Sequence, residues 1–431
     1  MIRHDKFKPL DIRLFCLVFM VGATRFFDFT IIARIPLAEI IAFSSVPFIL
    51  RSGNLSRIKI LPAFSLFMLW AISVMISDLV NESHFELFIR GVLKPVFSAM
   101  WMLFFIGVLL RDFRALNALP FGLFVAAHQN YFAPRGYSFL EISGEGYAAI
   151  AVGIVPICIS GAIVGATLVY KKSRLLASLC FIIFAIVLLA VGAPRNSPAI
   201  FLLVSFCLIL LAYLNRGGSR YFKLTATRLV LIFLGGLLVS LAIYYIYVFV
   251  ASSGYLGIER EKKLLTQATT VFGASPIGLI LDGRTYVFAA ILGIWDNPIF
   301  GFGSWSGIFM EGYFVKAVML IETDTSYTNA LMQDGGGRAG HSVLFTAWLE
   351  NGILAAIALI AIYYIMLIEF INLIRADNRF APLLISMFLI FSWAFFFSPF
   401  GIPERMTIGL FLAFNALRFN HQKNPKRLAQ R

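Results

Sequence analysis

Four polar residues stand at the ends of long hydrophobic runs, and their types suggest chemistry. They are Arg195, Arg284, Arg338 and His341. A guanidinium stays charged at any relevant pH, and its planar fork of donors matches the oxygens of a phosphate group. An imidazole titrates near neutrality, so it can accept a proton from an attacking hydroxyl or hydrogen-bond a phosphate oxygen. Together these residues predict a site that binds an anion and moves a proton.

Each of these residues also has a simpler explanation. An arginine at the end of a membrane helix can extend its side chain to the lipid headgroups, and a lone histidine there can serve as a cap or an interface residue. The turn "APRNSP" restricts Arg195 between two prolines, whereas Arg338 lies in the flexible stretch "QDGGGRAGH". From the residues alone, both interpretations remain open.

Ionisable residues also fall inside the hydrophobic runs, at Arg34, Glu39, Lys94 and Glu350. Such groups at membrane depth must be paired or functional. We expect the first three to neutralise one another, and for Glu350 we favour structural pairing over catalysis. The sequence contains no "HExxH" and no "GxxxxGK[ST]", and its outer loops hold no acidic cluster. It therefore predicts no metal site and no cofactor, and it disfavours an ATP-driven pump.

The elements that must position these residues are predicted to be membrane helices. The chain of 431 residues is 60% hydrophobic and 13% charged, too apolar to cover a soluble fold. Its long apolar runs lack the alternation of a lipid-facing strand, so we expect an all-α integral membrane protein with about twelve transmembrane helices. The expected spans are 12–27, 30–50, 60–77, 91–110, 115–128, 147–170, 175–192, 198–214, 229–250, 342–368, 381–398 and 406–418. The run 115–128 fits a re-entrant helix equally well.

Lysine and arginine alternate from loop to loop, which predicts the orientation. Most of the 36 basic residues fall on one side if both termini are cytoplasmic. We therefore expect helices one to nine in 1–250, a large periplasmic loop with short interfacial helices in 251–341, and helices ten to twelve with a cytoplasmic tail in 342–431. The net charge of +14 reflects these loops beside anionic lipid and does not require nucleic acid. The four cysteines have no metal or pairing pattern and are expected to be core residues.

Two segments resemble the bacterial O-antigen ligase and polymerase superfamily. Its ligase motif is His, then Asn, Ser or Gln, nine variable positions, Gly, two more, and Gly, Thr or Tyr. His341, Ser342, "VLFTAWLEN" and Gly352 match this pattern, and Ala355 departs from its last position. The segment "GRTYVFAAILGIWDNPIFGFGSW" is similar to the family's helix that an arginine opens and a Gly-x-Gly turn closes. The position of Arg195 matches an arginine in the family's tight outer turn.

The resemblance implies a metal-independent, inverting glycosyltransferase at the periplasmic face of the bacterial inner membrane. Its donor would be a glycan on undecaprenyl pyrophosphate, and its acceptor a hydroxyl on lipid A core, another glycan or a protein. Arg195 and Arg284 would be catalytic, because they would stabilise the departing pyrophosphate, and His341 would act on the acceptor hydroxyl. The residues that would bind the pyrophosphate or glycan are Arg195, Arg284, Arg338 and Ser342. A polysaccharide or O-antigen polymerase uses the same donor chemistry. A twelve-helix transporter or a lipid-linked glycan flippase remains the alternative of a different class.

Overall fold

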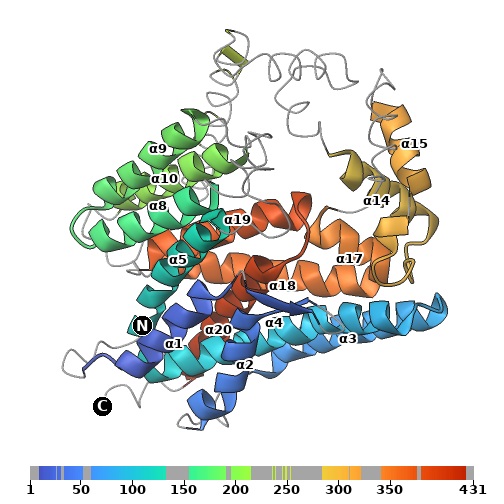
Figure 1. The fold of residues 1–431 in the computed structure, drawn as a ribbon, viewed down its shortest axis with the longest axis horizontal. Coiled ribbons are helices and arrows are strands. Elements are labelled where there is room, and N and C mark those ends of the chain that lie inside the picture. The colour runs from blue at the N-terminus through green and yellow to red at the C-terminus, as the bar shows by residue number, and fades with distance from the viewer. Residues whose placement is uncertain are drawn as a thin grey trace.

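The computed structural model describes a helical protein (Figure 1). The described residues are 9–25, 27–30, 34–51, 60–132, 155–190, 196–214, 284–309, 311–321, 341–375 and 380–423, with isolated positions between 235 and 253. The strands β1 (Asp28–Thr30) and β2 (Arg34–Pro36) form a small antiparallel hairpin. The helices are α1 (Ile12–Ala23), α2 (Leu37–Leu50), α3 (Leu61–Val80), α4 (Phe85–Asp112), η2 (Phe113–Asn117), α5 (Ala118–Phe132), α8 (Val155–Val169), α9 (Arg174–Ala190), α10 (Asn196–Leu214), α14 (Thr285–Asp296), η5 (Ser306–Phe309), α15 (Glu311–Ile321), α17 (Val343–Asn351), α18 (Ile353–Arg375), α19 (Ala381–Phe397) and α20 (Ile402–Lys423).

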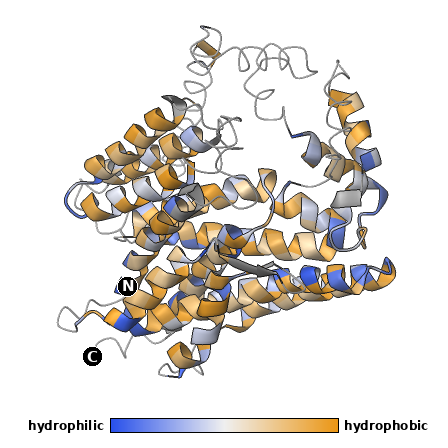
Figure 2. Ribbon diagram, viewed as in Figure 1, coloured by the Kyte–Doolittle hydropathy of each residue, from blue (hydrophilic) through white to orange (hydrophobic). Residues whose placement is uncertain are grey.

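The helical bundle is that of a membrane protein. Most of the helices consist mainly of hydrophobic residues, while hydrophilic residues gather toward the helix ends (Figure 2). Among the described residues, three helical stretches are long and apolar enough to cross a bilayer: Leu61–Val80, Phe85–His128 and Ile353–Leu373. Other apolar helices have 10–17 residues. The all-α prediction is confirmed at this level, whereas the count of twelve spans stays a prediction, and most of the ninth run lies outside the described residues.

An ion pair and hydrogen bonds join the start of α1 to the end of α4. The backbone N–H of Asp11, before α1, donates to Oδ2 of Asp112 at 3.3 Å. Arg114 bridges the same carboxylate at 2.8 Å and donates to the carbonyl oxygen of Pro9 at 2.9 Å. Because α4 ends here, the segment that precedes α1 lies at the opposite end of α4 from Phe85. This agrees with the alternation of basic loops in the sequence.

The expected span 342–368 is broken at Gly352 into α17 and α18, so the prediction of one continuous helix is wrong. Gly352 has a φ of +79°, a left-handed conformation that favours glycine. The break is stable because its carbonyl groups find partners on α3. Ser77 Oγ donates to the carbonyl oxygen of Glu350 at 2.7 Å, and Ser73 Oγ to that of Asn351 at 2.6 Å.

After the break, α18 runs back along α17, so the two helices form a hairpin (Figure 1). The C-terminal end of α17 lies beside Ser77, near the end of α3. At its other end, Ser342 Oγ donates to the carbonyl oxygen of Phe395 at 2.8 Å, and the Phe395 ring stacks on Tyr363 in the middle of α18. At 1.5 Å per residue, Ser342 lies roughly 13 Å deeper than Gly352. The helix α17 is therefore re-entrant, and its N-terminus points into the bundle.

Gly352→Ala is expected to destabilise the protein by more than about 2 kcal/mol, because alanine disfavours the left-handed backbone and its Cβ would overlap the carbonyl oxygen of Ile299. The measurement is the midpoint of thermal unfolding in detergent. Gly312→Ala is the matched control, since a Cβ at that position meets no atom within 4 Å. Equal midpoints for the two variants would contradict the proposed strain at the break.

Two buried carboxylates in the bundle, Glu39 and Glu350, each pair with a basic residue from a distant helix. Glu39 on α2 accepts from Arg405 Nε at 2.8 Å and from Trp101 Nε1 at 3.1 Å. Lys94 on α4 pairs with Glu350 on α17 at 2.7 Å, and its ammonium lies 4.8 Å from the Trp305 ring centroid. The expectation that Arg34, Glu39 and Lys94 neutralise one another is wrong for the last two. The side chain of Arg34 lies outside those described.

The pairing expected for Glu350 is confirmed, and the cysteines follow their prediction in part. All four are free, and Cys158 is buried while Cys180 and Cys207 are partly buried. Cys16 is exposed on α1 and is not a core residue. In a membrane protein an exposed apolar side chain on a helix faces lipid, which explains why a thiol is tolerated there.

Removing one partner of the Lys94–Glu350 pair is expected to cost about 3–5 kcal/mol, because the other charge then stays buried and unpaired. Lys94→Met and Glu350→Met should therefore each lower the unfolding midpoint. The double variant should recover much of the loss, since both charges are gone. A double variant whose loss equals the sum of the single losses would show that the two groups do not interact.

Candidate active site

His341 and Ser342 begin the re-entrant helix α17, and the backbone there is unusual. Ser342 caps the helix, because its Oγ accepts from the N–H of Phe345 at 3.1 Å while it donates to the carbonyl oxygen of Phe395. His341 has a φ of +64°, which is uncommon for a residue other than glycine. Its side chain is exposed at the helix N-terminus. The cap thus fixes the backbone that presents the imidazole.

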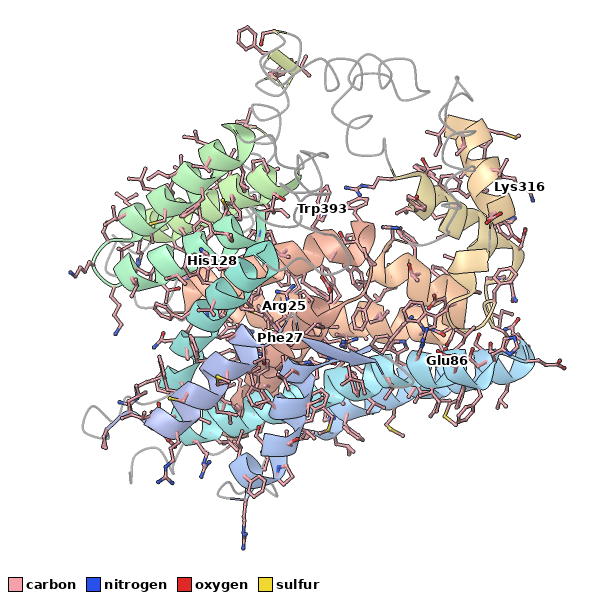
Figure 3. All side chains as sticks on the ribbon, in the orientation of Figure 1. Arg25, Phe27, Glu86, His128, Lys316 and Trp393 are labelled. Carbon is pink, nitrogen blue, oxygen red and sulfur yellow. The ribbon has the colours of Figure 1, made fainter. Side chains whose placement is uncertain are left out.

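Arg284 occupies the matching position before α14. Its backbone caps that helix, and its Nη1 donates to the carbonyl oxygen of Phe397 at 3.3 Å. The guanidinium carbon lies 5.0 Å from the Trp393 ring centroid and 5.2 Å from that of Phe397. Trp393 rises from α19 on the side toward α14 (Figure 3). Two rings and a carbonyl group therefore hold the arginine in place.

The two segments meet through an aromatic contact. The ring of Tyr286, on the first turn of α14, lies 4.5 Å from the ring of His341 with an interplanar angle of 33°. Ser342 and Arg284 bind the carbonyl oxygens of Phe395 and Phe397 on the last turn of α19. The structure therefore brings Arg284, His341 and Ser342 together from two helix N-termini and one helix C-terminus. Arg195 and Arg338 lie outside the described residues.

The electrostatics of this arrangement favour an anion. A helix N-terminus carries a partial positive charge and N–H groups that lack intrahelical partners. Both α14 and α17 begin at this place, and the guanidinium of Arg284 adds a full charge. In membrane proteins, short helices that begin inside the bundle commonly point their N-termini at the anionic group of a substrate. The arrangement can bind an anion at one side and present an imidazole at the other.

The segment 297–305, which we call the rim turn, fixes the outer ends of α14 and α17. The N–H groups of Phe302 and Gly303 donate to the carbonyl oxygens of Leu349 and Glu350, both at 2.9 Å. Gly301 and Gly303 have φ values of +71° and +86°. Glycine at these two positions avoids the strain that a side chain would add. The sequence "NPIFGFGSW" thus forms a turn that joins the end of α14 to the end of α17, and the turn requires its glycines.

Further contacts attach the rim turn to α3, and the end of α14 to α15. Asp78 accepts from Ser304 twice, from the backbone N–H at 2.6 Å and from Oγ at 2.7 Å. Tyr313 on α15 donates to Oδ2 of Asp296 at 2.6 Å, and burial together with this carboxylate raises the pKa of Tyr313 to about 12. The phenol is the donor in this hydrogen bond, which joins the end of α14 to α15.

Three residues of the site were absent from the sequence-based prediction. They are Tyr286, Trp393 and Phe397. For Trp393 and Phe397, the signal that could have found them is the aromatic run "SWAFFFSPF" at the end of an apolar stretch, which also marks a helix terminus. In the described part of the chain, no group of three or more histidine, cysteine, aspartate or glutamate side chains is arranged to hold a metal ion. No protein-family model matches the chain, and no curated protein is significantly similar to it.

Proposed function

We propose that the protein is a glycosyltransferase that moves a glycan from undecaprenyl pyrophosphate to an acceptor hydroxyl. The observation that carries this proposal is the convergence of Arg284, His341 and Ser342 at the end of α19. These three residues come from the two segments that resemble the O-antigen ligase and polymerase superfamily. The two segments are far apart in the sequence, and each resembles a motif of that superfamily. In the fold they lie next to each other.

The proposed reaction needs stabilised negative charge and a proton acceptor. The acceptor oxygen attacks the anomeric carbon and forms the new glycosidic bond, while the bond from that carbon to the pyrophosphate oxygen breaks with inversion. His341 takes the proton of the acceptor hydroxyl. The departing pyrophosphate keeps the bonding electron pair, and Arg284 with the N-termini of α14 and α17 stabilises its charge. Ser342 holds the start of α17, and Arg195 and Arg338 are proposed as additional phosphate ligands.

The location follows from the same proposal. We propose that the basic loops keep both termini in the cytoplasm, so that the N-termini of α14 and α17 open toward the periplasm of the bacterial inner membrane. The acceptor is a hydroxyl of lipid A core for a ligase. For a polymerase it is the growing end of another glycan. Both use the same donor and the same charge stabilisation, so one site serves either reaction.

A transporter or flippase for a lipid-linked glycan is the second candidate, and the break at Gly352 favours it. Discontinuous helices with N-termini at membrane depth are typical of secondary transporters, where they face substrate anions. Such a protein would move the intact molecule across the bilayer and form no bond. The distinction between the two candidates is therefore chemical.

The decisive experiment is incubation of purified protein with an undecaprenyl-pyrophosphate glycan, alone or with lipid A core, followed by mass analysis of the product. A glycan joined to lipid A core supports a ligase, and a doubled glycan formed from the donor alone supports a polymerase. In proteoliposomes, movement of the intact donor to the other leaflet with no new bond would replace the transferase by a flippase.

A further inference from the structure

The outward face of α14 carries apolar side chains that remain exposed. Ile291 is 41% exposed and Trp295 is 85% exposed, and their i, i+4 spacing places them on one face of the helix. The opposite face holds Ala289, Ala290 and Ile294, which pack against α15 and α17. The only charged residue of α14 is Asp296, at its last position. An amphipathic helix normally turns its polar face outward, so the exposed face of α14 needs an explanation.

This exposed face continues into the lipid-facing side of a membrane helix. Ile299 of the rim turn is 61% exposed, and its carbonyl oxygen accepts from the N–H of Ile353 at 3.1 Å. Ile353 begins α18, which is long and apolar enough to cross a bilayer. The exposed apolar residues of α18 follow helical spacing from this point inward: Ile353, Ile357, Ile360 and Tyr364. The two apolar faces therefore meet at Ile299 and form one continuous surface.

The depth of α14 fits the same surface. Its first residues lie at the end of α19, through the contacts of Arg284 with Phe397 and of Tyr286 with His341. His341 precedes the deep end of α17, and α14 packs alongside α17. Twelve residues of helix then rise roughly 18 Å to the rim turn. The helix α14 thus packs on α17 at the level of the outer half of α18, and not beyond the end of α18.

We infer that the face of α14 formed by Ile291, Trp295 and Ile299 is embedded in the acyl chains of the outer leaflet. The occupant is membrane lipid, because the face is uncharged and continuous with the lipid-facing side of α18. Trp295 lies at its outer end, where indole rings favour the boundary between acyl chains and headgroups. On this inference, α14 belongs to the membrane-embedded part of the protein and not to a water-exposed loop. The inference does not rest on the proposed glycosyl transfer.

The test compares spin labels in proteoliposomes of phosphatidylethanolamine and phosphatidylglycerol. The four native cysteines are replaced by alanine, and single cysteines are introduced by Ile291→Cys and Trp295→Cys. The control for lipid exposure is Ile357→Cys on α18, and the control for water exposure is Lys316→Cys on the exposed side of α15 (Figure 3). Collision rates with oxygen and with a water-soluble nickel chelate are then measured.

The expected result is that labels at 291 and 295 collide with oxygen as the label at 357 does, and are protected from the nickel chelate. Collision with the chelate at the rate seen at 316 would overturn the inference, because the face would lie in water. Protection from both reagents would also overturn it, since a second copy or another protein would cover the face. As a measurement that needs no introduced cysteine, brominated lipid should quench the wild-type protein more strongly than Trp295→Phe. Equal quenching would again contradict the inference.

Discussion

Arg284→Lys is expected to lower the rate of glycan transfer by about 100-fold or more, and Arg284→Ala by about 1,000-fold, the range seen when one donor to a developing charge is removed. Lysine keeps the positive charge but lacks the planar fork that lies over Trp393 and Phe397 while donating to a carbonyl oxygen. The measurement is the initial rate of product formation at saturating donor and acceptor.

Two controls separate this effect from misfolding. Arg90→Lys makes the same change at the start of α4, where the arginine pairs with Glu86 on the surface, and should leave the rate unchanged. The unfolding midpoint of Arg284→Lys should stay close to that of the wild type, because the helix cap at this position is made by the backbone. A normal transfer rate in Arg284→Lys would show that the guanidinium does not act on the leaving group.

The helices were predictable where apolar residues run without interruption, and the break in α17–α18 was not. Apolar residues lie on both sides of Gly352 in "VLFTAWLENGILAAIALI", so the run predicts one helix. The fold breaks it because Ser73, Ser77 and Lys94 satisfy the polar groups of Glu350 and Asn351 from far away in the chain. The local signal was the triplet "ENG" inside an apolar run. Its meaning depends on partners that the sequence does not identify.

The ion pairs show the same limit. Glu39 and Lys94 both occur in the first hundred residues, and we expected them to neutralise one another together with Arg34. Their partners instead come from α20 and α17, more than 250 positions further on. The sequence therefore predicted that charged side chains inside the bundle would be paired, because an unpaired charge is costly there. The identity of each partner depends on the order in which the helices pack.

The candidate site was predictable in its polar residues and not in its aromatic ones. Arg284 and His341 stood out because charged or titratable groups at helix ends are rare in such a chain. Tyr286 and Trp393 belong to apolar runs, where an aromatic residue is ordinary. Their roles appear only when α14, α17 and α19 meet and the rings lie against the guanidinium and the imidazole.

His341→Asn is expected to lower kcat by about 10² to 10⁴, the usual contribution of a positioned general base, with little change in KM. Asparagine is the informative replacement, because it tolerates the left-handed backbone that His341 adopts with its φ of +64°. His341→Ala would remove the imidazole and add backbone strain together, so its loss would have two causes. The measurement is a full rate profile against pH, at saturating acceptor.

The pH profile distinguishes a proton acceptor from a residue that only shapes the site. Imidazole accepts a proton only in its neutral form, so the wild-type rate should fall at acidic pH, and His341→Asn should lose this dependence. His128→Asn is the matched control, because His128 lies on α5 and hydrogen-bonds the carbonyl oxygen of Phe124 at 2.9 Å, away from the site. If His341→Asn kept both the wild-type kcat and the acidic fall, the general base would have to be another group, and His341 would act only as the residue that precedes the cap of α17.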